Sequence, residues 1–499
     1  MRHCLHSTPN TFPLSIMNAV SVPQDIARMI VKLIPHHTTL KALATVCLSF
    51  VSPCQEVLFQ KLVIDFRRRN LKDHVRNMHA FLTAHPYLRR YIYHLEIIDN
   101  STPFAHMRDT PVPLLEPATQ ELYSSSEMWH NRSIYAFLFE EHSLFPKLLN
   151  YLVKLSSIFI SIKNIQFSWR QLTPDVKNSL LRLFQRPDLH QLYLQGLKSI
   201  PVPALLEFQD LKELYLKECD MDLVSYDNPI ATTDFGNREE TQVMRRLEAL
   251  TIQELPASSF QVLLNLWKNN VNPAFIDMSS PRGLTIYIST FRELLFVESL
   301  FEMCQGVIET LTVHTWGLHL GTTYVPPSPI ELGVPSVYPH YDWFYHAMGP
   351  LKLTYPRRLV KLTLNVSFWR NMEMLEANGE LEWALQVLIE MPQDNILKEI
   401  IVNIRVGGGQ LAFVDFQRYC GWRNWENELK TTTTKWSGVE TILFLVCSDC
   451  GPRLSEEKAD IQSVIAKQMP SLMASGKLCV GHALLSSEGL IDHDIVRWV

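Results

Sequence analysis

The first clear pattern of apolar positions along the chain predicts a short helix near its N-terminal end. Apolar side chains recur there at the i, i+3, i+4, i+7 and i+8 spacing of one helix face, at Ile26, Met29, Ile30, Leu33 and Ile34. Pro23 stands where prolines start helices, and Pro35 stands where one ends. The helix therefore has a continuous apolar face that needs to be covered.

Two more short helices are predicted directly after the first one. A second set of apolar residues repeats the helical spacing, with Thr38 or Thr39 placed to cap it: Leu40, Leu43, Ala44, Cys47 and Val51. Ser52, Pro53 and Gln55 then have the order of an N-cap, a first-turn proline and a capping-box glutamine, which predicts a third helix. Three helices within residues 20–64 form a small module, so we expect its apolar surface to be covered by the rest of the chain or by a partner.

From residue 65 onward the apolar period changes from that of a helix to that of strands. A triplet with the spacing Leu-x-x-Leu-x-Leu occurs nine times, at Ile92/Leu95/Ile97, Leu155/Ile158/Ile160, Leu189/Leu192/Leu194, Leu211/Leu214/Leu216, Leu247/Leu250/Ile252, Ile308/Leu311/Val313, Leu359/Leu362/Leu364, Leu397/Ile400/Val402 and Val439/Ile442/Phe444. Helical patterns lie between several triplets, for example after a capping Thr173 and an initiating Pro174. Strands that alternate with helices predict a mixed α/β fold with parallel strands.

One pair of triplets indicates leucine-rich repeats. The segment from Leu211 to Cys219 matches the strand signature of such repeats, including its last cysteine, and it starts 22 residues after Leu189, inside the usual period of roughly 20 to 29. The other spacings are longer. We therefore expect residues 65–499 to form an irregular leucine-rich-repeat solenoid, with adjacent parallel strands at Leu189 and Leu211. A mixed sheet without solenoid curvature is the alternative.

Three insertions are expected in this array, near residues 99–130, 220–242 and 317–350. The last one is rich in proline and aromatic residues, and four of its aromatic side chains are candidates for a loop that binds a target: Tyr338, Tyr341, Trp343 and Phe344. A loop packed on itself is the alternative. The segment 220–242 is polar and is expected to be a plain mobile loop. Residues 1–16 show no structural pattern, and we expect them to be disordered or untranslated.

Charge and composition narrow the range of partners. The formal net charge of -5, from 46 basic and 51 acidic residues, disfavours a nucleic-acid-binding protein. Nine cysteines, spread thinly over 499 residues, are typical of reduced thiols in the cytoplasm or nucleus. No segment reaches the roughly 20 apolar residues of a spanning helix, so no membrane role is expected.

No catalytic or metal-binding pattern emerges from the sequence. Cys447 and Cys450 form a Cys-x-x-Cys pair without the second pair or the histidines that would complete a zinc site. The glycines at 407–409 are not followed by the residues of a phosphate-binding loop. We therefore expect no catalytic residue, no metal and no cofactor, although an enzyme whose site is assembled only in space is an alternative.

The N-terminal module resembles an F-box. The stretch VPQDIARMIVKLIPHHTTLKALATVCLSFVSPCQEVLFQKLVI has Val22, Pro23, Asp25 and Ile26 where that family begins with Leu-Pro, an acidic and an apolar residue, and Val46 and Cys47 where it has Val-Cys. The resemblance implies docking on a Skp-type adaptor and, through it, on a cullin-RING ubiquitin ligase. It assigns the docking surface or its support to Pro23, Ile26, Ile30, Leu33, Leu40, Leu43 and Val46.

As a whole, the chain resembles the F-box-like proteins with diverged leucine-rich arrays that are abundant in mushroom-forming fungi. This resemblance implies a non-enzymatic adaptor that binds a protein substrate through its leucine-rich array. A leucine-rich interaction scaffold with no role in a ubiquitin ligase is the alternative of the same class. The identity of the substrate does not follow from the sequence.

Overall fold

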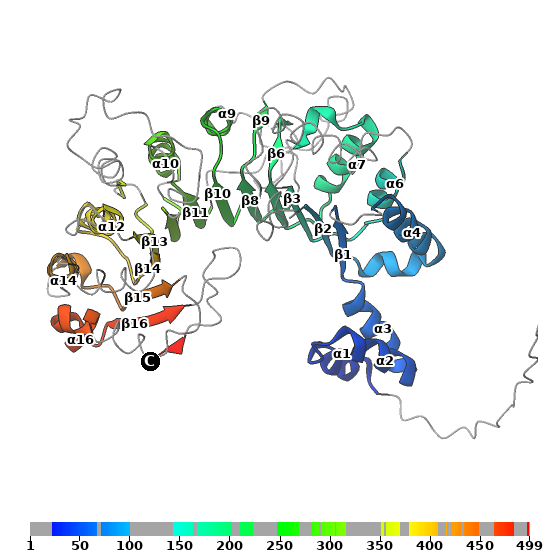
Figure 1. Ribbon diagram of the computed structural model, residues 1–499, viewed down its shortest axis with the longest axis horizontal. Helices are drawn as coiled ribbons and strands as arrows, with labels where there is room; N and C mark the ends of the chain where they lie inside the picture. Colours follow the sequence, from blue (N-terminus) through cyan, green and yellow to red (C-terminus); the bar gives the residue numbers. More distant parts are fainter. Residues whose placement is uncertain are drawn as a thin grey trace, which may run out of the picture.

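A computed structural model describes the chain in residues 22–66, 71–99, 143–162, 167–201, 210–222, 247–268, 281–288, 291–304, 306–315, 351–353, 356–369, 379–407, 416, 419, 421–430, 434–448, 464–483 and 497–498. Its main feature is a mixed α/β arrangement with a 13-stranded sheet in the described part, in which the first twelve strands are parallel and follow one another in chain order. Figure 1 shows these strands along an arc, with the helices on its outer side.

The strands of this sheet are short, with longer ones toward the C-terminal end: β1 (Lys61–Asp65), β2 (His94–Asp99), β3 (Ser157–Ile162), β5 (Gln191–Gln195), β8 (Glu213–Lys217), β10 (Ala249–Gln253), β11 (Gly283–Tyr287), β12 (Thr310–His314), β13 (Lys361–Trp369), β14 (Glu399–Gly407), β15 (Thr441–Ser448), β16 (Leu478–Ala483) and the antiparallel β17 (Arg497–Trp498). Two small ladders pair β4 (Phe167–Ser168) with β6 (Leu197–Lys198) and β7 (Ile200–Pro201) with β9 (Met221–Asp222).

Three helices precede the sheet, namely α1 (Gln24–Lys32), α2 (His37–Val46) and α3 (Leu48–Leu58). The other helices lie between strands: α4 (Leu71–Ala84), η1 (Pro86–Tyr91), α6 (Leu144–Asn150), η2 (Trp169–Gln171), α7 (Pro174–Phe184), α9 (Ala257–Lys268), α10 (Phe291–Met303), α12 (Gly379–Ile389), α14 (Trp422–Leu429), η6 (Thr434–Trp436) and α16 (Pro470–Ala474).

The apolar triplets lie in register across the sheet. Leu192 of β5 faces Leu214 of β8, and Leu194 faces Leu216. The prediction that the triplets at Leu189 and Leu211 form adjacent parallel strands is therefore confirmed. The same register continues through each neighbouring pair of parallel strands, so the leucine positions form continuous buried rows between the sheet and the outer helices. Burial of these rows is the main force that stacks the strands.

Backbone hydrogen bonds repeat at the start of the strands. The carbonyl oxygen of His190 accepts from the N–H groups of Lys212 and Glu213, at 2.8 and 2.9 Å, and the carbonyl of Lys212 accepts in the same way from the next strand. At the other strand end, the first residue after β5, β8 and β10 has a positive φ, at Gly196, Glu218 and Glu254. The three neighbouring strands β5, β8 and β10 thus end with the same local geometry.

The outer helices have the amphipathic pattern that their cover of the sheet requires. In α7 the Thr173 hydroxyl accepts from the N–H of Val176, and Pro174 occupies the first turn, as predicted. Its buried side chains include Val176, Leu180 and Leu183, which belong to the main core. Toward the C-terminal end, the core gains bulk from aromatic side chains: Phe416, Trp422, Trp425, Trp436 and Phe444.

The N-terminal module has a small core of its own, made of Ala27, Val31, Leu40, Phe50 and Cys54. Two details of the predicted helices are wrong. Cys47 is extended and separates α2 from α3, so Pro53 lies inside α3 and not in its first turn. No threonine side chain caps α2, whose N-cap residue is His36. The apolar period runs on across Cys47, which is why the break is not visible in the sequence.

Several expectations fall outside the described residues. They include the disorder of residues 1–16, almost all of the insertions near 99–130, 220–242 and 317–350, and the glycines after Gly407. Of the insertions, Asp99 ends β2, and residues 220–222 include β9.

Candidate docking and target-binding surfaces

Four of the five apolar residues predicted for the first helix face point away from the core of the module, whereas Ile34 packs partly buried against that core. On α1, the side chains of Ala27 and Val31 are 0% and 1% exposed, whereas Ile26, Met29, Ile30 and Leu33 are 47%, 64%, 39% and 82% exposed. These four residues form what we name the docking stripe. Figure 1 shows the module below β1, at one end of the arc. In the described part of the chain, the stripe belongs to the apolar surface that the core of the module leaves exposed.

The remaining residues predicted for docking divide into exposed and supporting positions. Pro23 and Val46 are exposed, and Val46 lies beside an even more exposed Leu48 at the break between α2 and α3. Leu40 is fully buried, and Leu43 packs partly buried against the module core. The two buried leucines therefore hold the helices that carry the exposed ones. His36 and His37 are exposed at the start of α2.

The loop predicted to bind a target, with Tyr338, Tyr341, Trp343 and Phe344, lies outside the described residues. A different aromatic surface is found on the inner face of the sheet. Phe159 of β3, Tyr193 of β5 and Tyr215 of β8 occupy the position between the two buried residues of each strand. Their rings stack with 4.0 Å between neighbouring centroids and interplanar angles of 17° and 14°. We name these three residues the aromatic strip.

The parallel register imposes this stack. Side chains at equivalent positions of neighbouring strands are separated by about the 4.8 Å strand spacing, so flat rings there lie face to face. At the same position, β10, β11, β12 and β13 have threonine instead, at Thr251, Thr285, Thr312 and Thr363. The aromatic strip is thus confined to three strands and is followed by small polar side chains.

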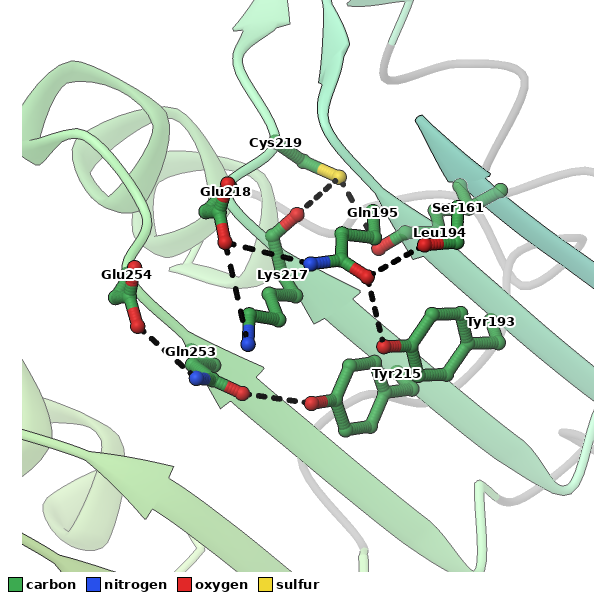
Figure 2. Close-up of polar contacts among 10 residues, drawn as sticks. All are labelled: Ser161, Tyr193, Leu194, Gln195, Tyr215, Lys217, Glu218, Cys219, Gln253 and Glu254. Atoms are coloured by element: carbon green, nitrogen blue, oxygen red, sulfur yellow. Dashed lines mark hydrogen bonds and ion pairs between the residues drawn. The ribbon is translucent and has the colours of Figure 1, made fainter. Parts of the chain in front are cut away.

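Two hydrogen-bond relays fix the tyrosines of the aromatic strip (Figure 2). The Tyr193 hydroxyl donates to Gln195 Oε1 at 3.2 Å, and Gln195 Nε2 donates to Glu218 Oε1 at 3.4 Å. Gln195 Oε1 also accepts from the Ser161 hydroxyl at 2.7 Å. Because a carboxylate only accepts hydrogen bonds, Glu218 sets the orientation of the Gln195 amide.

The second relay has the same order of residue types. The Tyr215 hydroxyl donates to Gln253 Oε1 at 2.7 Å, and Gln253 Nε2 donates to Glu254 Oε1 at 3.0 Å. Both glutamines are buried, so their amides are fixed within the sheet surface. The tyrosine hydroxyl protons are therefore directed inward, and the aromatic rings are held before any partner binds.

Negative charge borders the aromatic strip. Glu213 is exposed at the start of β8 and accepts from Gln191 Nε2 at 3.0 Å, and Glu254 is exposed at the end of β10. Glu218 forms a long ion pair of 3.9 Å with Lys217. Among the described residues, no ion pair includes Glu213 or Glu254, in contrast to the Lys61–Glu96 and Lys361–Glu399 pairs on other strands of the same face.

The described residues contain no cluster of metal-ligating side chains, and their cysteines are apart. No group of three or more histidine, cysteine, aspartate or glutamate side chains there could hold a metal ion. Cys447 is buried, and its predicted companion Cys450 lies outside the described part. Cys219, the last residue of the repeat signature, is fully buried, and burial raises the pKa of its thiol to about 12. Its Sγ donates to the carbonyl oxygens of Leu194 and Lys217, which is a structural role.

Comparison with known proteins gives no family for this chain. No family model matches it, and the search among curated proteins finds no match. In the part of the chain that the structure describes, no helix is long and apolar enough to cross a membrane.

The aromatic strip was not predicted from the sequence, although the positions of its three residues within the triplets could have indicated it. Each of its residues stands between the last two apolar positions of a triplet, at Phe159, Tyr193 and Tyr215. An alignment of the triplets by register would have placed the three rings side by side. The glutamine relays could not be found in this way, because Gln253 lies on the strand after Tyr215.

Proposed function

We propose that this chain is a substrate-recognition adaptor of the F-box kind. Its three-helix module docks on a Skp-type adaptor, and so on a cullin-RING ubiquitin ligase, while its curved array binds a protein target. The proposal includes a cytoplasmic or nuclear location and no catalytic activity of the chain itself.

The observation that carries the proposal is the docking stripe. A helix that used its larger apolar side chains for its own core would bury Ile30 and Leu33, but α1 buries Ala27 and Val31 instead. Full burial of a large apolar side chain contributes roughly 1.5 to 3 kcal/mol. Four such side chains at one exposed helix face are therefore a sufficient anchor for a protein partner.

The parallel, in-register strands support the finer part of the proposal, that the array is an irregular leucine-rich-repeat solenoid. The repeated carbonyl contacts before the strands and the positive φ after β5, β8 and β10 are what stacked copies of one unit would produce. In such an array the inner face is the target surface. The aromatic strip on that face is held rigidly by Gln195 and Gln253, so little side-chain entropy would be lost on binding.

Co-expression with a Skp-type adaptor tests the docking role. The wild-type chain is expected to co-purify with the adaptor. The double variant Ile26→Asp, Leu33→Asp is expected not to bind the adaptor, because each aspartate would place a charge in an apolar interface. The control is Leu295→Asp, Ile396→Asp, because these apolar residues are also exposed, by 50% and 51%, but lie outside the module. Circular dichroism shows whether each variant is folded.

Failure of the folded wild-type chain to bind would contradict the docking role and would favour a leucine-rich scaffold without ubiquitin chemistry. Equal binding by wild type and by the folded Ile26→Asp, Leu33→Asp variant would contradict the assignment of the stripe. Loss of binding in the Leu295→Asp, Ile396→Asp control as well would mean that the effect is not specific to α1.

A further inference from the structure

The aromatic strip and the carboxylates at its border offer mainly hydrogen-bond acceptors to a partner. Both tyrosine hydroxyl protons are committed to glutamine Oε1 atoms, so the tyrosines have no hydroxyl proton to donate to a partner. The neighbouring Glu213, Glu218 and Glu254 are acceptors as well. A partner that meets this surface must bring hydrogen-bond donors.

The charge of the same region also favours a partner that brings hydrogen-bond donors. Glu213 and Glu254 are exposed, and their side-chain partners are the neutral amides of Gln191 and Gln253. Elsewhere on this face, equivalent carboxylates are neutralised by lysine, as Glu399 is by Lys361 at 2.9 Å. Among the described residues, the border of the aromatic strip therefore has an excess of negative charge, because Lys217 pairs with Glu218 while no ion pair includes Glu213 or Glu254. Electrostatic complementarity selects a cationic partner.

We infer that the inner face of β5, β8 and β10 binds a basic segment of the target protein, in which arginine or lysine side chains meet Glu213 and Glu254 while apolar parts of the segment pack on the edges of the aromatic strip. The inference rests on the proposed function only in treating the inner face as the target surface. Arginine fits this role well, because its guanidinium is a planar donor that pairs with carboxylates and packs on aromatic rings.

Peptide binding tests this inference without the ubiquitin ligase. The full-length chain is titrated against three fluorescein-labelled peptides of equal length, built from alternating glycine with arginine, serine or glutamate, and binding is followed by fluorescence anisotropy. We expect binding of the arginine peptide, weakening as salt is added. We expect the serine peptide to bind far more weakly and the glutamate peptide not to bind.

Matched variants locate the site. The double variant Glu213→Gln, Glu254→Gln keeps an acceptor for Gln191 and Gln253. It is expected to lower the affinity for the arginine peptide about threefold to tenfold, because two ion pairs are lost. The double variant Tyr193→Phe, Tyr215→Phe keeps the stacked rings and tests the contribution of the two hydroxyl groups to peptide affinity separately. The control is Glu302→Gln, Glu390→Gln, in α10 and directly after α12, where the Glu390 carboxylate also accepts from a glutamine, Gln386. This control is expected to leave affinity unchanged.

Three results would overturn the inference: no binding of the arginine peptide by the folded chain up to about 1 mM, stronger binding of the glutamate peptide, or equal weakening by the control. Self-association of the chain that is lost in Tyr193→Phe, Tyr215→Phe would also overturn it, by assigning the face to a second copy. Because none of these variants touches α1, failure here leaves the adaptor test unaffected, and failure of the adaptor test leaves this one interpretable.

Discussion

Ser52 of α3 and Tyr91 of η1 share a hydrogen bond of 3.0 Å between their hydroxyl groups, and this contact joins the N-terminal module to the helical side of the sheet. The Tyr91 hydroxyl also accepts from Arg90 at 2.8 Å. The chain itself adds a second connection, because only two residues separate the end of α3 from Lys61 at the start of β1. The module is thus fixed to the array by a covalent and a polar contact.

Tyr91→Phe is expected to weaken this contact between the module and the array. The ring of Tyr91 is buried and is kept in the variant, so the change removes only the hydroxyl and its two hydrogen bonds. We expect the free energy of unfolding in urea to fall by about 1 kcal/mol. Tyr87→Phe is the control, because Tyr87 is 47% exposed and none of the hydrogen bonds found in the described part involves its hydroxyl. Equal stability of the two variants would contradict a role for the Ser52–Tyr91 contact.

Gly196 is expected to tolerate no side chain. Its φ is +75°, and an added Cβ would lie 1.8 Å from the carbonyl oxygen of Ile162 on the neighbouring strand. Gly196→Ala should therefore lower the free energy of unfolding by well over the roughly 1 kcal/mol that positive φ alone costs. Two controls separate the effect of the clash from the effect of the positive φ. Gly476→Ala has φ +70° with open space, and Gly306→Ala has open space. A similar loss for Gly196→Ala and Gly476→Ala would rule out the clash.

The thiol of Cys219 is expected to be unreactive in the folded protein. Burial raises its pKa to about 12 from the usual 9.0, so the reactive thiolate is nearly absent at neutral pH. Cys219→Ala should thus leave the number of thiols that react with a disulfide reagent unchanged in the native state and lower it by one in denaturant. A native Cys219 that reacts as fast as the half-buried Cys47 would contradict its placement.

The raised pKa also has a consequence for stability at high pH. Below pH 9 the thiol is protonated in both the folded and the unfolded chain and gives no pH dependence. Between about pH 9 and 12 the unfolded chain loses the proton and the folded one keeps it, so the free energy of unfolding falls as the pH rises through this range. Wild type is expected to lose stability more steeply than Cys219→Ala in this range.

The repeated strands were the most predictable part of the fold, because their signal lies in a fixed spacing of buried residues. Among the parallel strands after β1, the triplets missed two for a clear reason. In β11, Pro281 takes the place of the first apolar residue before Leu284 and Ile286, and in β16 that place belongs to Ser475. Register with the preceding strand, and not local sequence, defines both.

The candidate surfaces were less predictable, because exposure depends on how helices pack. The spacing of Ile26, Ile30 and Leu33 marks one apolar face of α1, but it does not reveal that the module core uses Ala27 and Val31. The glutamine relays depend on contacts between strands far apart in sequence, such as Tyr215 with Gln253. Such pairs follow only from three-dimensional register.

Hydrogen–deuterium exchange of the folded chain, alone and with an excess of a Skp-type adaptor, tests the central claim most directly. The account predicts slower exchange in peptides that cover α1 and the α2–α3 junction when the adaptor is present, and unchanged exchange in β5 and β8. No protection of α1 by a bound adaptor, or protection confined to the strands of the inner face, would contradict the assignment of the docking stripe.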